Sequence, residues 1–572
     1  MRSCSNAKVT NSRCMERLSL TLAMDPLAVL EMDVSASLAK ELESLQQQFT
    51  TAADMALQVN WSGNESIQYR ELVLTALFAE YTSEQSVPVG QAVFEAFCSK
   101  YCSTQDIHVC VDDFGLGGGG GGSGEHAHTV LRAFYKAQNV YRLNGGGQSH
   151  KRPLPALFST HSHRLLAMFG GQGGMDNYIE ETRSVYNMYH SLVANFVHRM
   201  CEFLKQEAAE PLFARLYHSG LDVRTWLEQP ECVPAQEYMI SVPVSIPVVG
   251  LTQLMQVVVL YKTLGMSPAE LASSFEAIAG HSQGIATATA LSMATADEDA
   301  FFKVCESILG LLILAGAYPQ LDYPVVVPTK RMSALAAPGG VTATPMVSVT
   351  KLSRLQLEAA ICKHNSQQQS SAEMVHLSLT NCAKVFVVSG VVESIEAFVG
   401  LLCKEHDTKG VDQTRVSHSQ RKTGVAVKYL SINAPYHCPL LTHAYEGACK
   451  YAARKGWVLE ASSMLRPVRA GDDGHDIRSE GSSITRYLMQ SMCVLPVNWP
   501  VAVGCAGITH VVDFGPGGVS GFGVLTQRIL DGQGVSVVCA GAVGRQKSSL
   551  AAKADLYQTC ASKLKSAVNW GE

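Results

Sequence analysis

The sequence lacks any excess of positive charge. Its 572 residues include 45 Lys and Arg against 50 Asp and Glu, which leaves a formal net charge of −5. No stripe of basic residues is interleaved with aromatic residues, so the electrostatic footprint of a nucleic-acid-binding protein is missing. We therefore expect no nucleic-acid partner.

Paired cysteines are also lacking. The 17 cysteines are scattered singly from Cys4 to Cys560. The closest pair, Cys98 and Cys102, has no second Cys/His pair at the spacing of a zinc site. Free thiols at this density suit a reducing compartment. The pattern predicts no metal and a cytoplasmic protein.

Long hydrophobic runs are few. Met1–Arg17 contains no apolar stretch that resembles a secretory signal, although its basic, Ser/Asn-containing composition leaves an organelle-targeting segment open. The longest uncharged run, Tyr238–Tyr261, is interrupted by prolines and glutamines. We interpret it as a strand, a turn and a buried helix, and we expect no membrane partner.

The chain is too long for one compact core, so several domains are expected. Apolar strands, at Leu165–Phe169, Ile240–Val249 and Ala277–Gly280, alternate with helical sequence, which favours a parallel sheet covered on both faces. We predict an α/β fold with these parts: a disordered tail (1–16), a helical region (17–160) with a glycine-rich loop (115–124), an α/β-hydrolase-like domain (161–340 and 433–545), an inserted subdomain (341–432) and a C-terminal helix or tail (546–572).

The inserted segment has a different order of predicted strands and helices from its surroundings. A strand at Met346–Val349 and a helix at Ser353–His364 precede a hairpin of Val375–Thr380 and Lys384–Ser389. A second helix, Val392–His406, and a closing strand, Lys428–Ile432, complete the order β-α-β-β-α-β. This order predicts a ferredoxin-like subdomain.

A nucleophile motif lies at Gly280-His281-Ser282-Gln283-Gly284, between an apolar strand and Ala-rich helical sequence. In such a G-x-S-x-G elbow the glycines permit a tight turn that exposes the serine at a helix N-terminus. The amide of Gln283 is then placed to donate to a developing oxyanion. We interpret His281 as a structural residue that packs under the turn.

A serine nucleophile needs a base, and spacing alone does not choose among the 18 histidines. His437 stands out because it follows a strand and a proline turn in Asn433-Ala-Pro-Tyr-His437-Cys-Pro. A hydrogen-bonded core histidine is the alternative interpretation of such a position.

Five segments together resemble the malonyl/acetyl transferase family of fatty acid and polyketide synthases. They are Phe169-Gly-Gly-Gln172-Gly, Gly-His-Ser282-Gln-Gly, Asn381 in TNCAKVFVVSG, Ala-Pro-Tyr-His437 and Asp513-Phe-Gly-Pro-Gly-Gly518. Within that family the chain is most similar to the N-terminal acetyltransferase region of the fungal-type fatty acid synthase beta subunit. The resemblance covers about 165–545 strongly. Starter-unit transacylases of fungal polyketide synthases share these elements.

The resemblance implies roles for residues at the matching positions. Ser282 would be the acylated nucleophile and His437 its general base. Gln172, with Gly171 and Gly173, would shape the oxyanion site beside Gln283. A backbone carbonyl from the loop Phe514-Gly515-Pro516-Gly517 would orient the imidazole, with no third carboxylate, so we interpret Asp513 as structural. Asn381 would line the cleft.

The absence of an arginine indicates whether the transferred acyl group is charged or neutral. Family members that use malonyl carry an arginine on the helix after the nucleophile, where it binds the free carboxylate. The corresponding position here aligns with Ala315-Gly316. An unpaired carboxylate there would cost several kcal/mol. We therefore expect a neutral acyl group, acetyl first, with room for a longer chain.

The expected partners are an acyl-CoA, an acyl carrier protein and other fatty acid synthase subunits. No tightly bound cofactor is expected; coenzyme A thioester is the substrate, and phosphopantetheine belongs to the carrier. The alternatives are a starter-unit transacylase of polyketide synthesis, a serine hydrolase or thioesterase, and a non-catalytic piece of a synthase.

Overall fold

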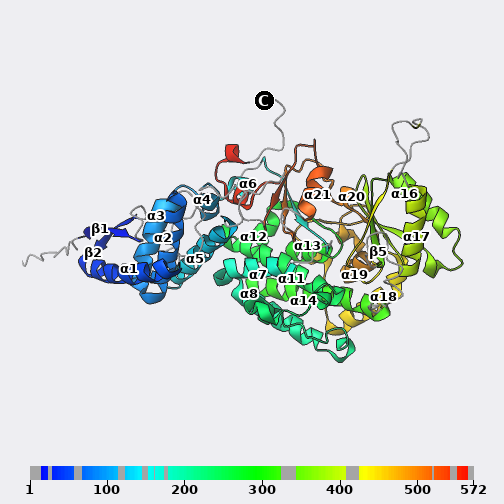
Figure 1. Ribbon diagram of the computed structural model, residues 1–572, viewed down its shortest axis with the longest axis horizontal. Helices are drawn as coiled ribbons and strands as arrows, with labels where there is room; N and C mark the ends of the chain where they lie inside the picture. The colour runs from blue at the N-terminus through cyan, green and yellow to red at the C-terminus, as the bar shows by residue number, and fades with distance from the viewer. Residues whose placement is uncertain are drawn as a thin grey trace, which may run out of the picture.

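The computed structural model places a helical N-terminal region, a large α/β domain and a smaller β-sheet subdomain side by side along the molecule (Figure 1). The structure describes residues 15–22, 29–56, 67–113, 123–144, 153–159, 162–172, 178–323, 343–406, 416, 424–517, 521–541 and 550–564.

The large domain is built on a five-stranded sheet with the order β12-β11-β3-β4-β9. Every neighbouring pair in this sheet is parallel. The central strand is buried at all five positions, as expected where helices cover both faces of a parallel sheet. The strands are β3 (Leu165–Phe169), β4 (Phe275–Gly280), β9 (Val468–Arg469), β11 (His510–Asp513) and β12 (Ser536–Cys539).

Helices surround this sheet, and the predicted parallel-sheet α/β class is confirmed. The longer helices of the domain are α7 (Tyr178–Met188), α8 (His190–Ala208), α11 (Val242–Leu264), α13 (Gly284–Ser292), α14 (Glu298–Asp322), α18 (Thr442–Lys455), α19 (Thr485–Cys493) and α21 (Phe522–Ile529). The shorter ones are α6 (Ala156–Ser159), α9 (Val223–Glu228), α10 (Gln236–Met239), α12 (Pro268–Ser273) and α20 (Trp499–Val503).

The strand predicted at 240–249 is wrong, because that segment begins helix α11. Its β-branched residues favour a strand locally, but the helix is buried on every side and tertiary packing decides. Pro243 lies in the first turn, where a proline is tolerated. Pro247 supplies no N–H for the carbonyl of Pro243, and the Tyr217 hydroxyl donates to that carbonyl instead, at 3.0 Å.

Two helices of the described residues, α11 and α14, are long and apolar enough to cross a membrane by length and composition. The most apolar window of α11 is 100% buried within the protein and that of α14 is 72% buried. Both helices therefore serve as core helices of this domain.

The subdomain has the predicted ferredoxin-like order. Strand β5 (Met346–Thr350) and helix α16 (Arg354–Asn365) precede the hairpin of β6 (His376–Cys382) and β7 (Val385–Ser389). Helix α17 (Val392–Glu405) and strand β8 (Ala426–Tyr429) follow it. The sheet order is β10-β6-β7-β5-β8. The edge strand β10 (Val497–Asn498) comes from the large domain and pairs in parallel with β6, which ties the two units together.

The N-terminal region differs from the prediction at its start. The strands β1 (Met15–Thr21) and β2 (Val29–Ser35) form an antiparallel hairpin, so residues 15 and 16 do not belong to a disordered tail, and the region is not wholly helical. Residues 1–14 and most of the glycine-rich loop lie outside the described residues, whereas Ser123 and Gly124 begin α5. The helices are α1 (Ala36–Ala56), α2 (Ile67–Gln85), α3 (Val87–Tyr101), α4 (Ile107–Asp113) and α5 (Ser123–Leu143).

The C-terminal segment is not an α-helix over its described residues. It forms the short 3-10 helices η10 (Lys553–Tyr557) and η11 (Ala561–Lys563). Ala551 makes a parallel bridge to Val538 in β12, so the segment packs against the edge of the main sheet.

Candidate active site

Ser282 lies at the sharp turn between β4 and α13. Its backbone has a φ of 54°, in the left-handed region that costs energy for a non-glycine residue. A Cβ on Gly280 would lie 2.2 Å from backbone atoms of Gly284 and Ile285, and one on Gly284 would lie 2.4 Å from the Phe169 carbonyl oxygen. The turn therefore requires glycine at both positions, as the motif predicts.

The fold brings His437 to this turn from the loop between β8 and α18. The Ser282 Oγ and the His437 Nε2 are 2.8 Å apart, a hydrogen-bond distance. His437 is buried and also has a positive φ, 60°. Two strained residues held in contact indicate a site where the surrounding structure fixes the geometry.

The orientation of the imidazole differs from the prediction. The Nδ1 atom of His437 lies 2.8 Å from the carbonyl oxygen of Leu495, and its backbone N–H donates to Cys493. A carbonyl only accepts, so Nδ1 carries the proton and Nε2 is free to accept from the serine hydroxyl. A backbone carbonyl does orient the base, but it belongs to the segment after α19, and its assignment to the loop 514–517 is wrong.

The loop 514–517 instead supports the glycine-rich segment after β3. The Gly515 carbonyl accepts from the Gly170 amide at 2.9 Å and from the Gln253 side chain at 2.7 Å. Phe514 stacks on Phe169, with ring centroids 4.9 Å apart, and Pro516 lines the active-site cavity. The loop therefore supports the glycine-rich segment and forms part of the cavity wall.

Burial lowers the pKa of His437 to about 4, while hydrogen bonds to the carbonyls of Leu495 and Ser491 act in the opposite direction. A buried imidazole loses the hydration of its charged form, so the neutral base is favoured. His437 is therefore unprotonated, and able to accept a proton, throughout the neutral pH range.

Three of the predicted oxyanion residues, Gln283, Gln172 and Gly171, line the same cavity as Ser282. The backbone N–H of Gln283 has no hydrogen-bond partner among the described residues. The side chain of Gln172 donates to Ser245 Oγ, which holds it at the cavity edge. A Cβ on Gly171 would lie 3.3 Å from the Ser282 Cβ, so this glycine lies directly against the nucleophile. The remaining residue, Gly173, lies outside the described residues.

A cavity of about 440 Å³ opens at Ser282, between the large domain and the ferredoxin-like subdomain. Ala315 and Asn381 line it, as predicted, and most other lining residues are apolar. Lys428, an exposed residue of β8, is the one Lys or Arg among the lining residues that the structure describes. The remaining lining side chains include Ile246, Met346, Leu379, Val387, Leu430, Ile432, Tyr436, Met492, Phe522 and Leu525.

Two buried carboxyl groups lie under the loop 514–517. Asp513 Oδ1 accepts from the Gly515 amide, and burial raises the pKa of this carboxyl to about 7. Glu181 accepts from the Gly517 amide at 2.8 Å, and burial raises its pKa as well. These carboxyls hold the loop rather than the imidazole, because the Nδ1 of His437 is bonded to Leu495.

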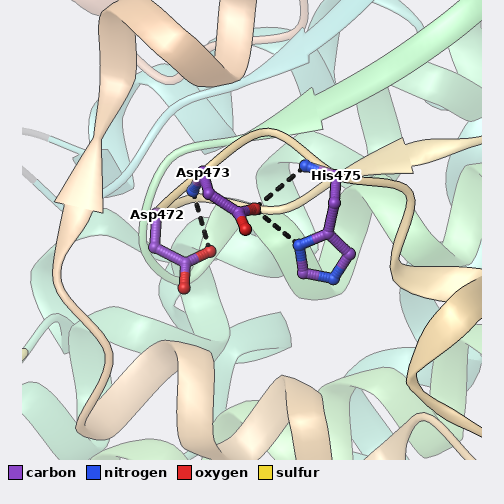
Figure 2. Close-up of side chains that lie close together, drawn as sticks. All are labelled: Asp472, Asp473 and His475. Atoms are coloured by element: carbon purple, nitrogen blue, oxygen red, sulfur yellow. Dashed lines mark hydrogen bonds and ion pairs between the residues drawn. The ribbon is translucent and has the colours of Figure 1, made fainter.

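A separate polar cluster of Asp472, Asp473 and His475 lies in the loop between β9 and η8 (Ile477–Glu480) (Figure 2). The imidazole Nδ1 lies 2.5 Å from an Asp473 oxygen, and Nε2 lies 2.6 Å from Glu480. Although burial lowers it, the pKa of His475 is raised overall by these two carboxylates. The contacts are those of a protonated histidine in a surface turn, and we assign the cluster to the loop.

Sequence reasoning missed the Leu495 carbonyl. A carbonyl is present at every residue, so no residue type marks the one that orients a histidine. Only the packing of the segment after α19 against His437 distinguishes it.

The chain is similar in sequence to known proteins. Residues 167–437 match the family described as "Starter unit:ACP transacylase in aflatoxin biosynthesis". The chain is 34% identical over 415 residues to the fatty acid synthase subunit beta of Saccharomyces cerevisiae, covering 72% of this chain and 20% of that protein. The subunit of Schizosaccharomyces pombe is 32% identical over 507 residues, covering 87% and 23%.

The chain thus spans about a fifth of the length of these relatives. A solved structure, the MCAT from Streptococcus pneumoniae, is 18% identical with a TM-score of 0.43, covering 65% of this chain and 95% of that one. This chain is a relative of the fungal fatty acid synthase beta subunits and contains a domain of the starter unit:ACP transacylase family.

Proposed function

We propose that this chain transfers a neutral acyl group, acetyl first, from acyl-CoA to the phosphopantetheine thiol of an acyl carrier protein through an acyl-Ser282 intermediate. The observation that carries the proposal is the 2.8 Å contact between Ser282 Oγ and a neutral, oriented His437. Fatty acid synthesis is the proposed pathway, because the relatives are named as subunits of fatty acid synthases.

The first half-reaction forms the acyl-serine. His437 Nε2 accepts the hydroxyl proton as Ser282 Oγ attacks the thioester carbonyl. The tetrahedral oxyanion lies by the free amide of Gln283, and one such donor lowers a barrier by about 3–4 kcal/mol. The C–S bond then breaks, and the imidazolium returns its proton to the departing coenzyme A sulfur.

The second half-reaction reverses these steps with another thiol. The carrier's phosphopantetheine thiol gives its proton to His437 and attacks the acyl-serine carbonyl. Collapse of the intermediate breaks the C–O bond, and Ser282 recovers its proton. Such ping-pong chemistry needs only one nucleophile and one base.

A neutral acyl group is supported by the cavity. Ala315 occupies its wall, and no arginine is among the lining residues that the structure describes. A malonyl carboxylate directed at Ala315 would lie unpaired against apolar side chains, which costs several kcal/mol. Lys428, the one Lys or Arg among the described lining residues, is exposed and comes from β8 of the subdomain. A longer neutral chain, such as hexanoyl, meets no such penalty.

Single-turnover labelling tests the proposal. The purified chain is mixed with acetyl-, hexanoyl- or malonyl-CoA, and the intact mass is measured before and after addition of a holo carrier protein. We expect an acetyl adduct on the wild type that the carrier removes, a weaker malonyl adduct, and none on Ser282→Ala. Full labelling of Ser282→Ala would refute the acyl-serine, whereas rapid loss of the adduct to water without carrier would indicate a hydrolase.

A further inference from the structure

His281, the neighbour of Ser282, links the two halves of the cavity. Its Nε2 lies 2.9 Å from the Oδ1 of Asn381. His281 belongs to the elbow of the large domain, whereas Asn381 lies on β6 of the ferredoxin-like subdomain. Both residues line the cavity, so this hydrogen bond crosses from one wall to the other.

The imidazole of His281 is otherwise held by aromatic rings. The Phe522 ring centroid lies 4.0 Å away and that of Trp499 lies 5.3 Å away. The residue is 2% exposed, and its Nδ1 has no hydrogen-bond partner among the described residues. Asn381 is therefore its one polar side-chain partner in the part of the chain that the structure describes. Burial lowers the pKa of His281 to about 3, so the ring is neutral, and we assign the proton to Nε2, where the Asn381 oxygen accepts it.

The same imidazole presses on the glycine-rich segment. A Cβ on Gly171 would lie only 2.8 Å from His281 Nδ1, so the ring packs directly against this segment. The ring is thus fixed on one side by Gly171 and on the other by Asn381. The ring therefore lies in contact with both β6 and the glycine-rich segment beside the elbow.

The elbow itself does not depend on Asn381. The His281 N–H donates to the Phe169 carbonyl at 2.8 Å, and the Gly284 N–H donates to the His281 carbonyl at 2.9 Å. These backbone bonds remain if the Asn381 side chain is removed. The opposite wall of the cavity is formed by Ser348, Leu379 and other subdomain residues. This wall would lose its hydrogen bond to the elbow.

We propose that Asn381 is a positioning residue: through His281 it holds the ferredoxin-like subdomain over Ser282, so that the long arm of a coenzyme A thioester is aligned with the nucleophile. The inference rests on the proposed acyl-Ser282 chemistry. It adds that long thioesters need the His281–Asn381 hydrogen bond for alignment. A small activated ester, which does not reach across the cavity, reacts without this hydrogen bond.

The test compares two acyl donors on Asn381→Ala: acetyl-CoA and p-nitrophenyl acetate, with acyl-enzyme followed by quench and intact mass. We expect the acylation rate constant with acetyl-CoA to fall about tenfold, as loss of one buried hydrogen bond allows, and that with p-nitrophenyl acetate to stay within about twofold. Asn381→Asp keeps an acceptor oxygen in place and should recover most of the acetyl-CoA rate.

Asn365→Ala is the matched control. Asn365 makes two hydrogen bonds with the backbone of Val375, both 2.9 Å, inside the same subdomain and outside the cavity lining. We expect this variant to lower the melting temperature while leaving the ratio of the two acylation rates unchanged.

Three results would overturn the inference alone: a wild-type acetyl-CoA rate in Asn381→Ala, an equal fall with both donors, or the same selective fall in Asn365→Ala. If Asn381→Ala does not fold, the two donors are compared on Asn381→Asp alone, and a large fall selective for acetyl-CoA in that variant counts against the inference in the same way. A wild type that neither donor labels would instead refute the acyl-serine proposal, and the inference with it.

Discussion

The pH dependence of serine acylation tests the state of the base. Burial lowers the pKa of His437 to about 4, against an ordinary value near 6.5. Acylation of the free enzyme requires the neutral imidazole, so its rate follows the unprotonated fraction. At pH 5 that fraction is about 0.9 for a pKa of 4 and about 0.03 for a pKa of 6.5. The two cases differ about 30-fold in rate.

The assay uses p-nitrophenyl acetate, which carries no acid or base that titrates between pH 5 and 8. Acyl-enzyme is quantified by intact mass at short times, with Ser282→Ala as the blank, and circular dichroism at each pH verifies that the fold persists. We expect a rate that is nearly constant from pH 8 down to pH 5 and that falls below it. A half-maximal rate near pH 6.5 would refute the argument that burial controls this imidazole.

Three further predictions follow from the site. Gly284→Ala should lose acylation and at least about 2 kcal/mol of stability, since its Cβ would overlap the Phe169 carbonyl at the end of β3. Gly400→Ala, in a helix with open space around the added Cβ, should not destabilise, and chemical denaturation measures both. Ala315→Arg should lower acetyl loading and raise the malonyl-to-acetyl ratio in a competition assay, and Ala315→Leu should not raise that ratio. The free energy of unfolding should fall as pH drops from about 6.5 toward 4. The buried imidazoles of His281, His437 and His510 have lowered pKa values and each gains a proton on unfolding in this window, which outweighs the opposite effect of the two buried carboxyls with raised pKa values, Asp513 and Glu181. A flat denaturation midpoint there would contradict this.

The local parts of the site could be predicted from the residues alone. Gly280 and Gly284 are required by steric contacts within and next to one turn, and an apolar strand before Ser282 is visible in the residues themselves. The ferredoxin-like order was likewise predictable, because each of its strands and helices carries its own periodicity. These features depend on residues close together in the chain.

His437 was identified through resemblance to a family, since no spacing rule joins it to Ser282. The tertiary structure decided which carbonyl orients the imidazole: it belongs to Leu495, and neither its residue type nor its position along the chain distinguishes it. The same holds for the helix at Val242–Leu264, where burial on all sides overrides a local preference for strand, and for the His281–Asn381 bond, which joins two domains. Contacts between distant segments depend on how the chain packs, and a list of residue types does not contain that information.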